Sequence, residues 1–223
     1  MEVGRSQVID RESMLARIYV IRHGETEWSR SGQHTGLTDI PLTAHGEDGA
    51  QELGQRLRNI SFARVFTSPR QRARRTCELA GLAPVAEIEP DLAEWDYGDY
   101  EGQRSVDILK GRPDWNLFRD GCPCGESPAQ VSDHADRFIA RLRALEGNVA
   151  LFSHGHFGRV LAARWIGSLV SQAQHLLLST ASISILSYEH NHADEPVIAL
   201  WNAGSREVFG DIASAIEPKP CRP

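Results

Sequence analysis

Short apolar runs alternate along the chain with longer segments in which apolar residues recur at helical spacing. Many residues of the runs are β-branched or aromatic, so we predict strands at residues 18–21, 65–66, 85–88, 149–152, 183–188 and 197–200. Helices are predicted at residues 44–58, 70–79, 105–110 and 157–166, and from Ser127 onward. Strands that alternate with helices indicate an α/β fold, a three-layer α/β/α sandwich with a mostly parallel sheet.

One domain accounts for this pattern, because no linker, internal repeat or low-complexity tract divides the chain. We expect an N-terminal extension over residues 1–16, a folded domain over 17–215 and a disordered, proline-containing tail over 216–223. Residues 26–42 are polar and are predicted to form a loop. The segment 90–125 is long and contains several glycines, and such a segment is usually functional or carries short helices of its own.

Two of the predicted strands end in a histidine followed by a glycine. The first strand runs into Arg22-His23-Gly24, and the strand at 149–152 runs into Ser153-His154-Gly155-His156. In an open α/β sheet, ligands bind beyond the carboxyl ends of the strands. We therefore expect a cation and two imidazoles to meet in one pocket at that edge of the sheet.

Composition limits the classes of partner. The chain has 223 residues, 41% of them hydrophobic and 24% charged, and a net charge of −6. Such acidity argues against a nucleic-acid partner but not against a small anionic substrate, because arginines in a cleft can dominate the local field. No apolar run is long enough for a membrane span. We expect no membrane partner and leave a homodimer open beside a monomer.

The four cysteines do not change this picture. Cys122 and Cys124 flank a proline, and no matching pair of cysteines or histidines lies nearby to complete a zinc site. Their close spacing also makes a mutual disulfide strained. We therefore expect reduced thiols in a cytoplasmic protein and no bound metal.

Four features together resemble the histidine phosphatase superfamily, also called phosphoglycerate mutase-like. They are the motif 22–26 (RHGET), the strand end 153–155 (SHG), the arginine-rich helix start 68–73 and the acidic, aromatic segment 92–102. The resemblance extends from about residue 17 to about residue 201. It implies the phosphoglycerate mutase-like fold and a phosphomonoester hydrolase that needs neither metal nor cofactor and acts through phosphohistidine.

The resemblance also implies a role for each catalytic residue. His23 is the expected nucleophile, since a neutral imidazole can attack phosphorus and split a difficult step into two. Arg22 and Arg72 are expected to bind the phosphoryl oxygens with their forked guanidinium groups. His154 is expected to hold the same group as a cation. Glu94 stands where the family has its proton donor, which protonates the leaving alcohol and then activates water.

Aromatic neighbours favour Glu94 as the acid. Trp95 and Tyr97 are expected to shield its carboxyl group and keep its pKa high enough to hold a proton, since burial disfavours the charged form. The nearby carboxylates compete for the role on sequence alone; they are Asp96, Asp99 and Glu101. For the arginines near position 72 the alternative is a solvated helix face, and His156 is expected to be structural.

Several residues are candidates for substrate binding. Ser29 occupies the position where many members have an asparagine that donates to the phosphate. Serine can also donate, but its side chain is shorter and has a single donor. Thr35 is expected to offer its hydroxyl and Gly36 its amide, with Trp95 and Tyr97 close by. The candidates for a second phosphate of a sugar bisphosphate are Arg70 and Arg119.

Within the superfamily, the sequence favours a phosphatase. Residues 104–125 form a compact segment without the mutase signature, and residues 94–102, 115–122 and 125–127 resemble bacterial acid phosphatases and fungal sedoheptulose-1,7-bisphosphatases. The expected substrates are small phosphorylated metabolites, in particular sugar phosphates or bisphosphates. Three alternatives stay open: a phosphoglycerate mutase, a protein phosphohistidine or phosphotyrosine phosphatase, and a non-catalytic protein that binds phosphate esters.

Overall fold

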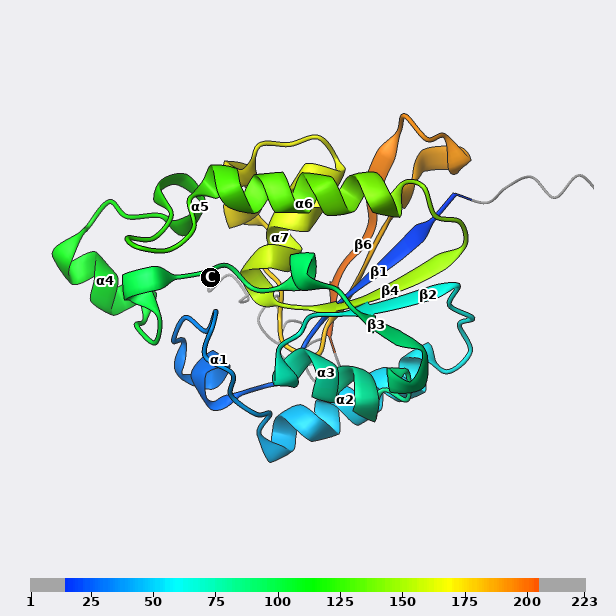
Figure 1. Cartoon of the computed structure of the whole chain (residues 1–223), viewed down its shortest axis with the longest axis horizontal. Coiled ribbons are helices and arrows are strands. Elements are labelled where there is room, and N and C mark those ends of the chain that lie inside the picture. The colour runs from blue at the N-terminus through cyan, green and yellow to red at the C-terminus, as the bar shows by residue number, and fades with distance from the viewer. Residues whose placement is uncertain (1–14, 205–223) are drawn as a thin grey trace, which may run out of the picture.

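A computed structural model describes residues 15–204 of the chain (Figure 1). Within these residues, six strands form one sheet in the order β3-β2-β4-β1-β5-β6. Their bounds are β1 (Arg17–Arg22), β2 (Arg64–Thr67), β3 (Ala86–Ile88), β4 (Asn148–Ser153), β5 (Ile183–Tyr188) and β6 (Pro196–Ala203). The first four strands pair in parallel, whereas β5 is antiparallel to both β1 and β6. The predicted mostly parallel sheet is confirmed, with an antiparallel pair at one edge.

Helices cover both faces of the sheet, which confirms the predicted three layers. The helices α2 (Ala44–Leu57) and α3 (Gln71–Leu79) lie on one face, and α6 (Pro128–Leu142) and α7 (Gly155–Trp165) on the other (Figure 1). Alternate residues of β1 explain how both layers are held. Ile18 and Val20 belong to the core under α6 and α7, and Ile21 to the core under α2 and α3.

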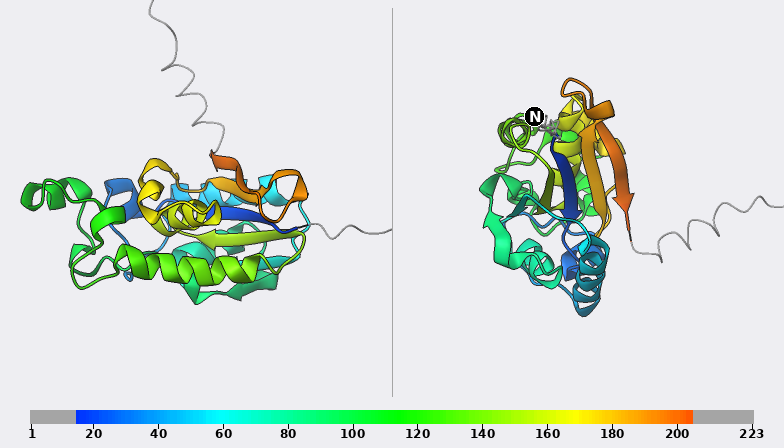
Figure 2. Two further views of the ribbon diagram at one scale, coloured as in Figure 1. Left: turned by 90° about the horizontal axis from the view of Figure 1, so that it is seen from above. Right: turned by 90° about the vertical axis from the view of Figure 1, so that its right-hand side faces the viewer.

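Three short helices lie beyond the carboxyl ends of the parallel strands. They are α1 (Glu27–Ser31), α4 (Ser105–Gly111) and α5 (Leu117–Asp120), and Figure 2 shows α1 and α4 at the same end of the molecule in its left view. Short 3-10 helices complete the connections: η1 (Ala83–Val85), η2 (Pro90–Leu92), η3 (Gly98–Tyr100), η4 (Val170–His175) and η5 (Glu189–Asn191). The short helices therefore close the edge at which the two histidine motifs end.

Hydrogen-bonded caps explain where the predicted helices begin. The Thr43 hydroxyl accepts from the amide of Gly46, and Ser127 forms a capping box with Gln130 at the start of α6. The predicted loop at 26–42 is wrong at its start, because α1 occupies five of its residues. Thr26 and Ser29 cap this helix reciprocally, and a helix so short has no apolar periodicity from which to predict it.

The predicted domain limits can be compared with the structure only in part. Residues 1–14 and 205–223 lie outside the described residues, and with them most of the expected extension and the whole expected tail. The last two residues of the extension belong to the folded body, because Leu15 forms a β-bridge with Glu146 and Ala16 is buried. Between residues 15 and 204, none of the helices has the length and apolar character needed to cross a membrane.

Candidate active site

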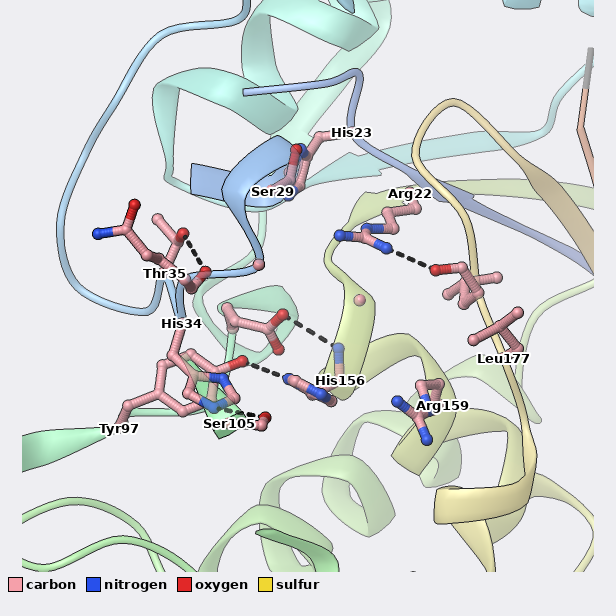
Figure 3. Close-up of a pocket in the computed structure, with 15 residues that line it drawn as sticks. Arg22, His23, Ser29, His34, Thr35, Tyr97, Ser105, His156, Arg159 and Leu177 are labelled. Carbon is pink, nitrogen blue, oxygen red and sulfur yellow. Dashed lines mark hydrogen bonds between the residues drawn. The ribbon is translucent and has the colours of Figure 1, made fainter. Parts of the chain in front are cut away.

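The two histidine motifs meet because β1 and β4 are parallel neighbours. Arg22 is paired with Ser153 in the sheet, and the His23 amide donates to the Ser153 carbonyl at 3.0 Å. The rings of His23 and His154 consequently lie with their centroids 5.2 Å apart. Beside them is a cavity of about 260 Å³ (Figure 3), lined by Arg22, His23, Ser29, Gly32, Gln33, His34, Thr35, Glu94, Tyr97, Ser105, Gly155, His156, Arg159, Leu177 and Leu178.

His23 is held as a neutral imidazole with one nitrogen free. Its Nδ1 lies 2.7 Å from the Gly24 carbonyl oxygen, which can only accept, so Nδ1 carries the proton. Burial lowers the pKa of His23 well below its usual value, and the charges of Arg72 and Arg22 lower it further. Nε2 makes no hydrogen bond within residues 15–204, and the residue lines the cavity. This arrangement leaves a nitrogen lone pair available to an electrophile.

His154 is held differently, with both ring nitrogens engaged. The Arg72 Nε–H donates to Nδ1 at 3.2 Å, and Nε2 lies 2.7 Å from the Ser68 hydroxyl oxygen. Because Nδ1 accepts, the proton of the neutral ring is on Nε2. Burial lowers the pKa of His154 well below its usual value, with Arg72 and His23 as further causes. The predicted cation stays a prediction; the Arg72 contact with Nδ1 and the lowered pKa favour a neutral ring, since burial and a neighbouring guanidinium disfavour the charged form.

The two arginines of the site also differ in how many donors are free. Arg72 is fully buried and donates to His154 Nδ1 and to the carbonyl oxygens of Thr35, Gly36 and Thr38. Four of its five N–H groups are thus engaged, and Arg72 is not among the residues that line the cavity. Among the described residues, the Arg22 guanidinium makes one hydrogen bond, from Nη1 to the Leu178 carbonyl oxygen, and its buried Nε has no partner (Figure 3). Of the two arginines that we expected to bind the phosphoryl group with a forked donor, Arg22 is therefore the one with free donors.

Glu94 is oriented by three backbone amides. Its Oε1 accepts from Trp95 and Phe157 and its Oε2 accepts from His156, at distances of 2.8 to 3.0 Å. Two of these amides open α7, so they are donors without a partner inside the helix. Glu94 also lines the cavity, which places a carboxyl group beside His23 and Arg22.

The competing carboxylates are engaged in holding loops. Glu101 accepts from the amides of Gly36 and Thr38, and Asp96 accepts from the amide of Gly98. None of Asp96, Asp99 and Glu101 is among the residues that line the cavity.

Trp95 does not stand over Glu94 as the sequence suggested. Its ring is fully buried in the core, its Nε1 donates to the Glu126 carbonyl oxygen, and it is not part of the cavity lining. Tyr97 does line the cavity, and its hydroxyl is hydrogen-bonded to His156 Nδ1 at 2.5 Å (Figure 3). Burial raises the pKa of Tyr97 well above its usual value, with Glu94 as a further cause.

The loop 29–36 reaches the cavity, but its polar groups are used otherwise than expected. The Ser29 hydroxyl accepts from the Thr26 amide and donates to the Thr26 carbonyl oxygen, so it caps α1. The Gly36 amide donates to Glu101, and the Thr35 hydroxyl donates to the Gln33 carbonyl oxygen. In place of free donors, this loop presents carbonyl oxygens that bind Arg72.

Neither candidate for a second phosphate lies in the cavity lining. Arg119 is exposed and pairs with Asp120 at 2.8 Å. Arg70 is the N-cap residue of α3, and its buried Nε has no partner among residues 15–204. A surface arginine paired with its own neighbour has little to distinguish it in sequence from one that faces a ligand.

Several residues of the cavity lining were not predicted from the sequence as site residues. They are Gln33, His34, Ser105, Arg159, Leu177 and Leu178, and His156 was assigned a structural role only. Helical spacing could have revealed Arg159, which follows His156 by three positions on α7 and so shares its face. The others come from loops and from the start of α4, which have no periodicity to reveal which side chains point inward.

Three of the lining residues form a neutral cluster. The His34 ring lies 4.6 Å from the Tyr97 ring and 5.6 Å from the His156 ring, measured between centroids. Burial lowers the pKa of His34 to about 4 and that of His156 well below its usual value. At neutral pH this side of the cavity carries hydrogen-bonding groups without charge.

Comparison with known proteins places the chain in a family. The family model for the histidine phosphatase superfamily (branch 1) matches residues 18–204. An acid phosphatase of Mycobacterium tuberculosis is 42% identical, over 82% of this chain and 92% of that protein. A sedoheptulose 1,7-bisphosphatase of Saccharomyces cerevisiae is 36% identical, over 84% of this chain and 93% of that protein.

A solved structure gives the same answer for the fold. The product of an open reading frame of Mycobacterium tuberculosis superposes with a TM-score of 0.79 at 39% identity, over 85% of this chain and 98% of that one. The family match covers both strand-end histidines, both arginines and Glu94. The chain belongs to the histidine phosphatase superfamily (branch 1), and the general reaction that this membership assigns to it is that of a phosphatase.

Proposed function

We propose that the protein hydrolyses small phosphorylated metabolites, sugar phosphates or bisphosphates, through a phosphohistidine intermediate and without a metal ion. One observation carries the proposal: His23 is neutral, with Nε2 open to the cavity next to the unengaged donors of Arg22. A nucleophile with a free lone pair beside a cation is the arrangement that attack on an anionic phosphorus centre requires.

The reaction proceeds in two displacements. In the first, the Nε2 lone pair of His23 attacks phosphorus, the bond to the ester oxygen breaks, and Glu94 gives its proton to the departing oxygen. In the second, Glu94 takes a proton from water, the water oxygen attacks phosphorus and the P–N bond breaks, which releases phosphate. Arg22 and the remaining N–H of Arg72 stabilise the phosphoryl oxygens throughout.

The rest of the cavity supports a polar, uncharged leaving group. The neutral cluster of His34, Tyr97 and His156 can exchange hydrogen bonds with hydroxyl groups, as a sugar would provide. Arg159 also lines the cavity, so a second anionic group of a bisphosphate has a cation available. The relative from Saccharomyces cerevisiae, a sedoheptulose 1,7-bisphosphatase, is consistent with this class of substrate.

A substrate panel with excess chelator tests the proposal. It contains p-nitrophenyl phosphate, sugar monophosphates and bisphosphates, phosphoglycerates and a phosphotyrosine peptide, each with wild type and His23→Ala. We expect phosphate release that persists in chelator, is fastest for a sugar phosphate and is lost in His23→Ala. Loss of activity in chelator would overturn the metal-independent mechanism. Conversion of 3-phosphoglycerate to its 2-isomer, a preference for the peptide, or binding without turnover would each replace the proposal by one alternative.

A further inference from the structure

The segment that carries Glu94 has no regular structure to hold it. Residues 93–97 lie between η2 and η3 and belong to no helix or strand. A general acid must nevertheless stay within hydrogen-bond reach of the leaving oxygen, and a misplacement of about 1 Å can cost on the order of a hundredfold in rate. Something outside the segment must therefore fix its position.

Glu126 makes three hydrogen bonds to the two residues after Glu94. Its carbonyl oxygen accepts from Trp95 Nε1 at 3.0 Å, its amide donates to the Asp96 carbonyl oxygen at 2.9 Å, and its Oε2 accepts from the Asp96 amide at 2.8 Å. The backbones are in close contact here, since a Cβ on Gly125 would lie 2.4 Å from the Asp96 carbonyl oxygen. Only the third of these bonds depends on the Glu126 side chain.

The other carboxylate oxygen of Glu126, Oε1, faces a histidine that packs against α7, the helix whose amides bind Glu94. Oε1 lies 3.4 Å from Nε2 of His134 on α6. The His134 ring stacks on the ring of Phe157, with centroids 4.9 Å apart and planes at 4°. Phe157 is the residue of α7 whose amide donates to Glu94 Oε1 at 2.8 Å. One carboxylate thus connects the segment after Glu94 with the helix that supplies its amide donors.

We propose that Glu126 is a positioning residue, which orients Glu94 for proton transfer through the Asp96 amide and through His134. The inference rests on the proposed function, because it assumes that Glu94 is the acid. Glu126 lies outside the cavity lining, so it acts through Glu94 and does not touch the substrate.

Leaving-group dependence distinguishes positioning from simple structural support. A p-nitrophenolate ion departs without a proton, whereas a sugar alkoxide needs one, and kcat/KM reports the step in which this group leaves. For Glu126→Ala we expect kcat/KM for a sugar phosphate to fall on the order of tenfold, and that for p-nitrophenyl phosphate to change less than about twofold. Glu126→Gln keeps an acceptor for the Asp96 amide, so its values should return to within about threefold of wild type.

Two further variants keep the test decisive. His134→Phe retains an aromatic ring on Phe157 and loses the contact with Glu126, so we expect a smaller selective loss, which also serves if Glu126→Ala fails to fold. Asp136→Ala is the matched control on α6, since its carboxylate binds Arg164 at 2.8 and 2.9 Å away from the site. This control should leave the ratio of the two kcat/KM values unchanged.

The outcomes separate the inference from the proposed function. An equal loss on both substrates, or no loss on either, in Glu126→Ala and His134→Phe would overturn the inference while leaving the function intact. Glu94→Gln must show the same selectivity with a larger loss; without it the assignment of the acid fails, and the inference with it. A wild-type protein that releases no phosphate from either substrate would overturn the function itself.

Discussion

The ends of β1 and β4 carry the same short motif, a histidine followed by glycine, yet the structure gives the two histidines different hydrogen bonds. At the end of β1, the only hydrogen-bond partner of the His23 ring among the described residues is the Gly24 carbonyl oxygen, and Nε2 is open. At the end of β4, His154 lies between the guanidinium of Arg72 and the hydroxyl of Ser68. Burial lowers the pKa of both rings, and their hydrogen bonds favour a proton on Nδ1 of His23 and on Nε2 of His154.

This difference shows that the partner of the second nitrogen decides the chemistry of each ring. A carbonyl oxygen on Nδ1 fixes the proton there and leaves a nucleophilic Nε2, whereas a donor to Nδ1 moves the proton to Nε2 and makes that atom a hydrogen-bond donor. The free Nε2 of His23 is therefore suited to attack, whereas both nitrogens of His154 are engaged by Arg72 and Ser68.

The largest expected effect concerns which imidazole carries the phosphoryl group. A rapid quench with ³²P-labelled substrate should trap label on wild type and on His154→Gln, and none on His23→Gln. Steady-state turnover of His23→Gln should fall by at least about a thousandfold, as for other nucleophiles removed from a covalent mechanism. The label should be stable in base and labile in acid, as expected of a phosphoramidate. Label retained in His23→Gln would contradict the comparison of the two histidines.

Lysine substitutions should separate the two arginines of the site. Arg22→Lys loses the forked donor for the phosphoryl group, and we expect kcat/KM to fall about a hundredfold, equivalent to roughly 3 kcal/mol. Arg72→Lys should in addition lower the free energy of unfolding by roughly 2 kcal/mol, because buried carbonyl oxygens lose their donors. Urea denaturation followed by tryptophan fluorescence measures the second effect. Equal losses of stability in both variants would contradict the assignment of Arg72 as the internally bonded arginine.

The sequence was sufficient to predict which strands form this site and at which edge of the sheet it lies. Apolar runs located the strands, and strands ending in 22–24 and 153–156 indicated that one sheet edge would gather the chemistry, which the structure confirms. A resemblance to the histidine phosphatase superfamily added the names of the candidate residues. These inferences succeed because strand direction alone places the ends of parallel neighbours together.

The hydrogen bonds and ion pairs of the site's side chains could not be predicted from the sequence. That Arg72 would donate to the loop carbonyls of Thr35 and Gly36 depends on a contact between segments more than thirty residues apart, which no local pattern reports. The exposed pairing of Arg119 and the inward position of His34 depend likewise on loop conformation. Loops lack the periodicity that identifies a buried face, so their contributions stay hidden until the fold is known.

A smaller effect is expected from the partner of His154. Ser68→Ala removes the group that binds Nε2, while the Arg72 contact with Nδ1 stays. We expect kcat/KM to fall about fivefold, since one neutral hydrogen bond to a buried group is worth about 1 kcal/mol. Ser68→Thr keeps the hydroxyl and is the matched control, and both should be compared at a fixed pH. A loss as large as that of His23→Gln would mean that Ser68 takes part in bond breaking.

The smallest perturbation is a change of pH alone, which tests directly whether His23 and His154 are both neutral. Because both pKa values are lowered, neither ring should gain a proton as the pH falls through 6.5, where an unperturbed imidazole titrates. Side-chain ¹⁵N resonances of the folded protein should show protonated Nδ1 in His23 and protonated Nε2 in His154, unchanged from pH 7.5 to 5.5. The unfolded chain binds these protons below pH 6.5 and the folded chain does not, so the free energy of unfolding should decrease as the pH falls. His23→Gln and His154→Gln should each reduce that slope, and a ring that titrates near 6.5 would show that its pKa is not lowered.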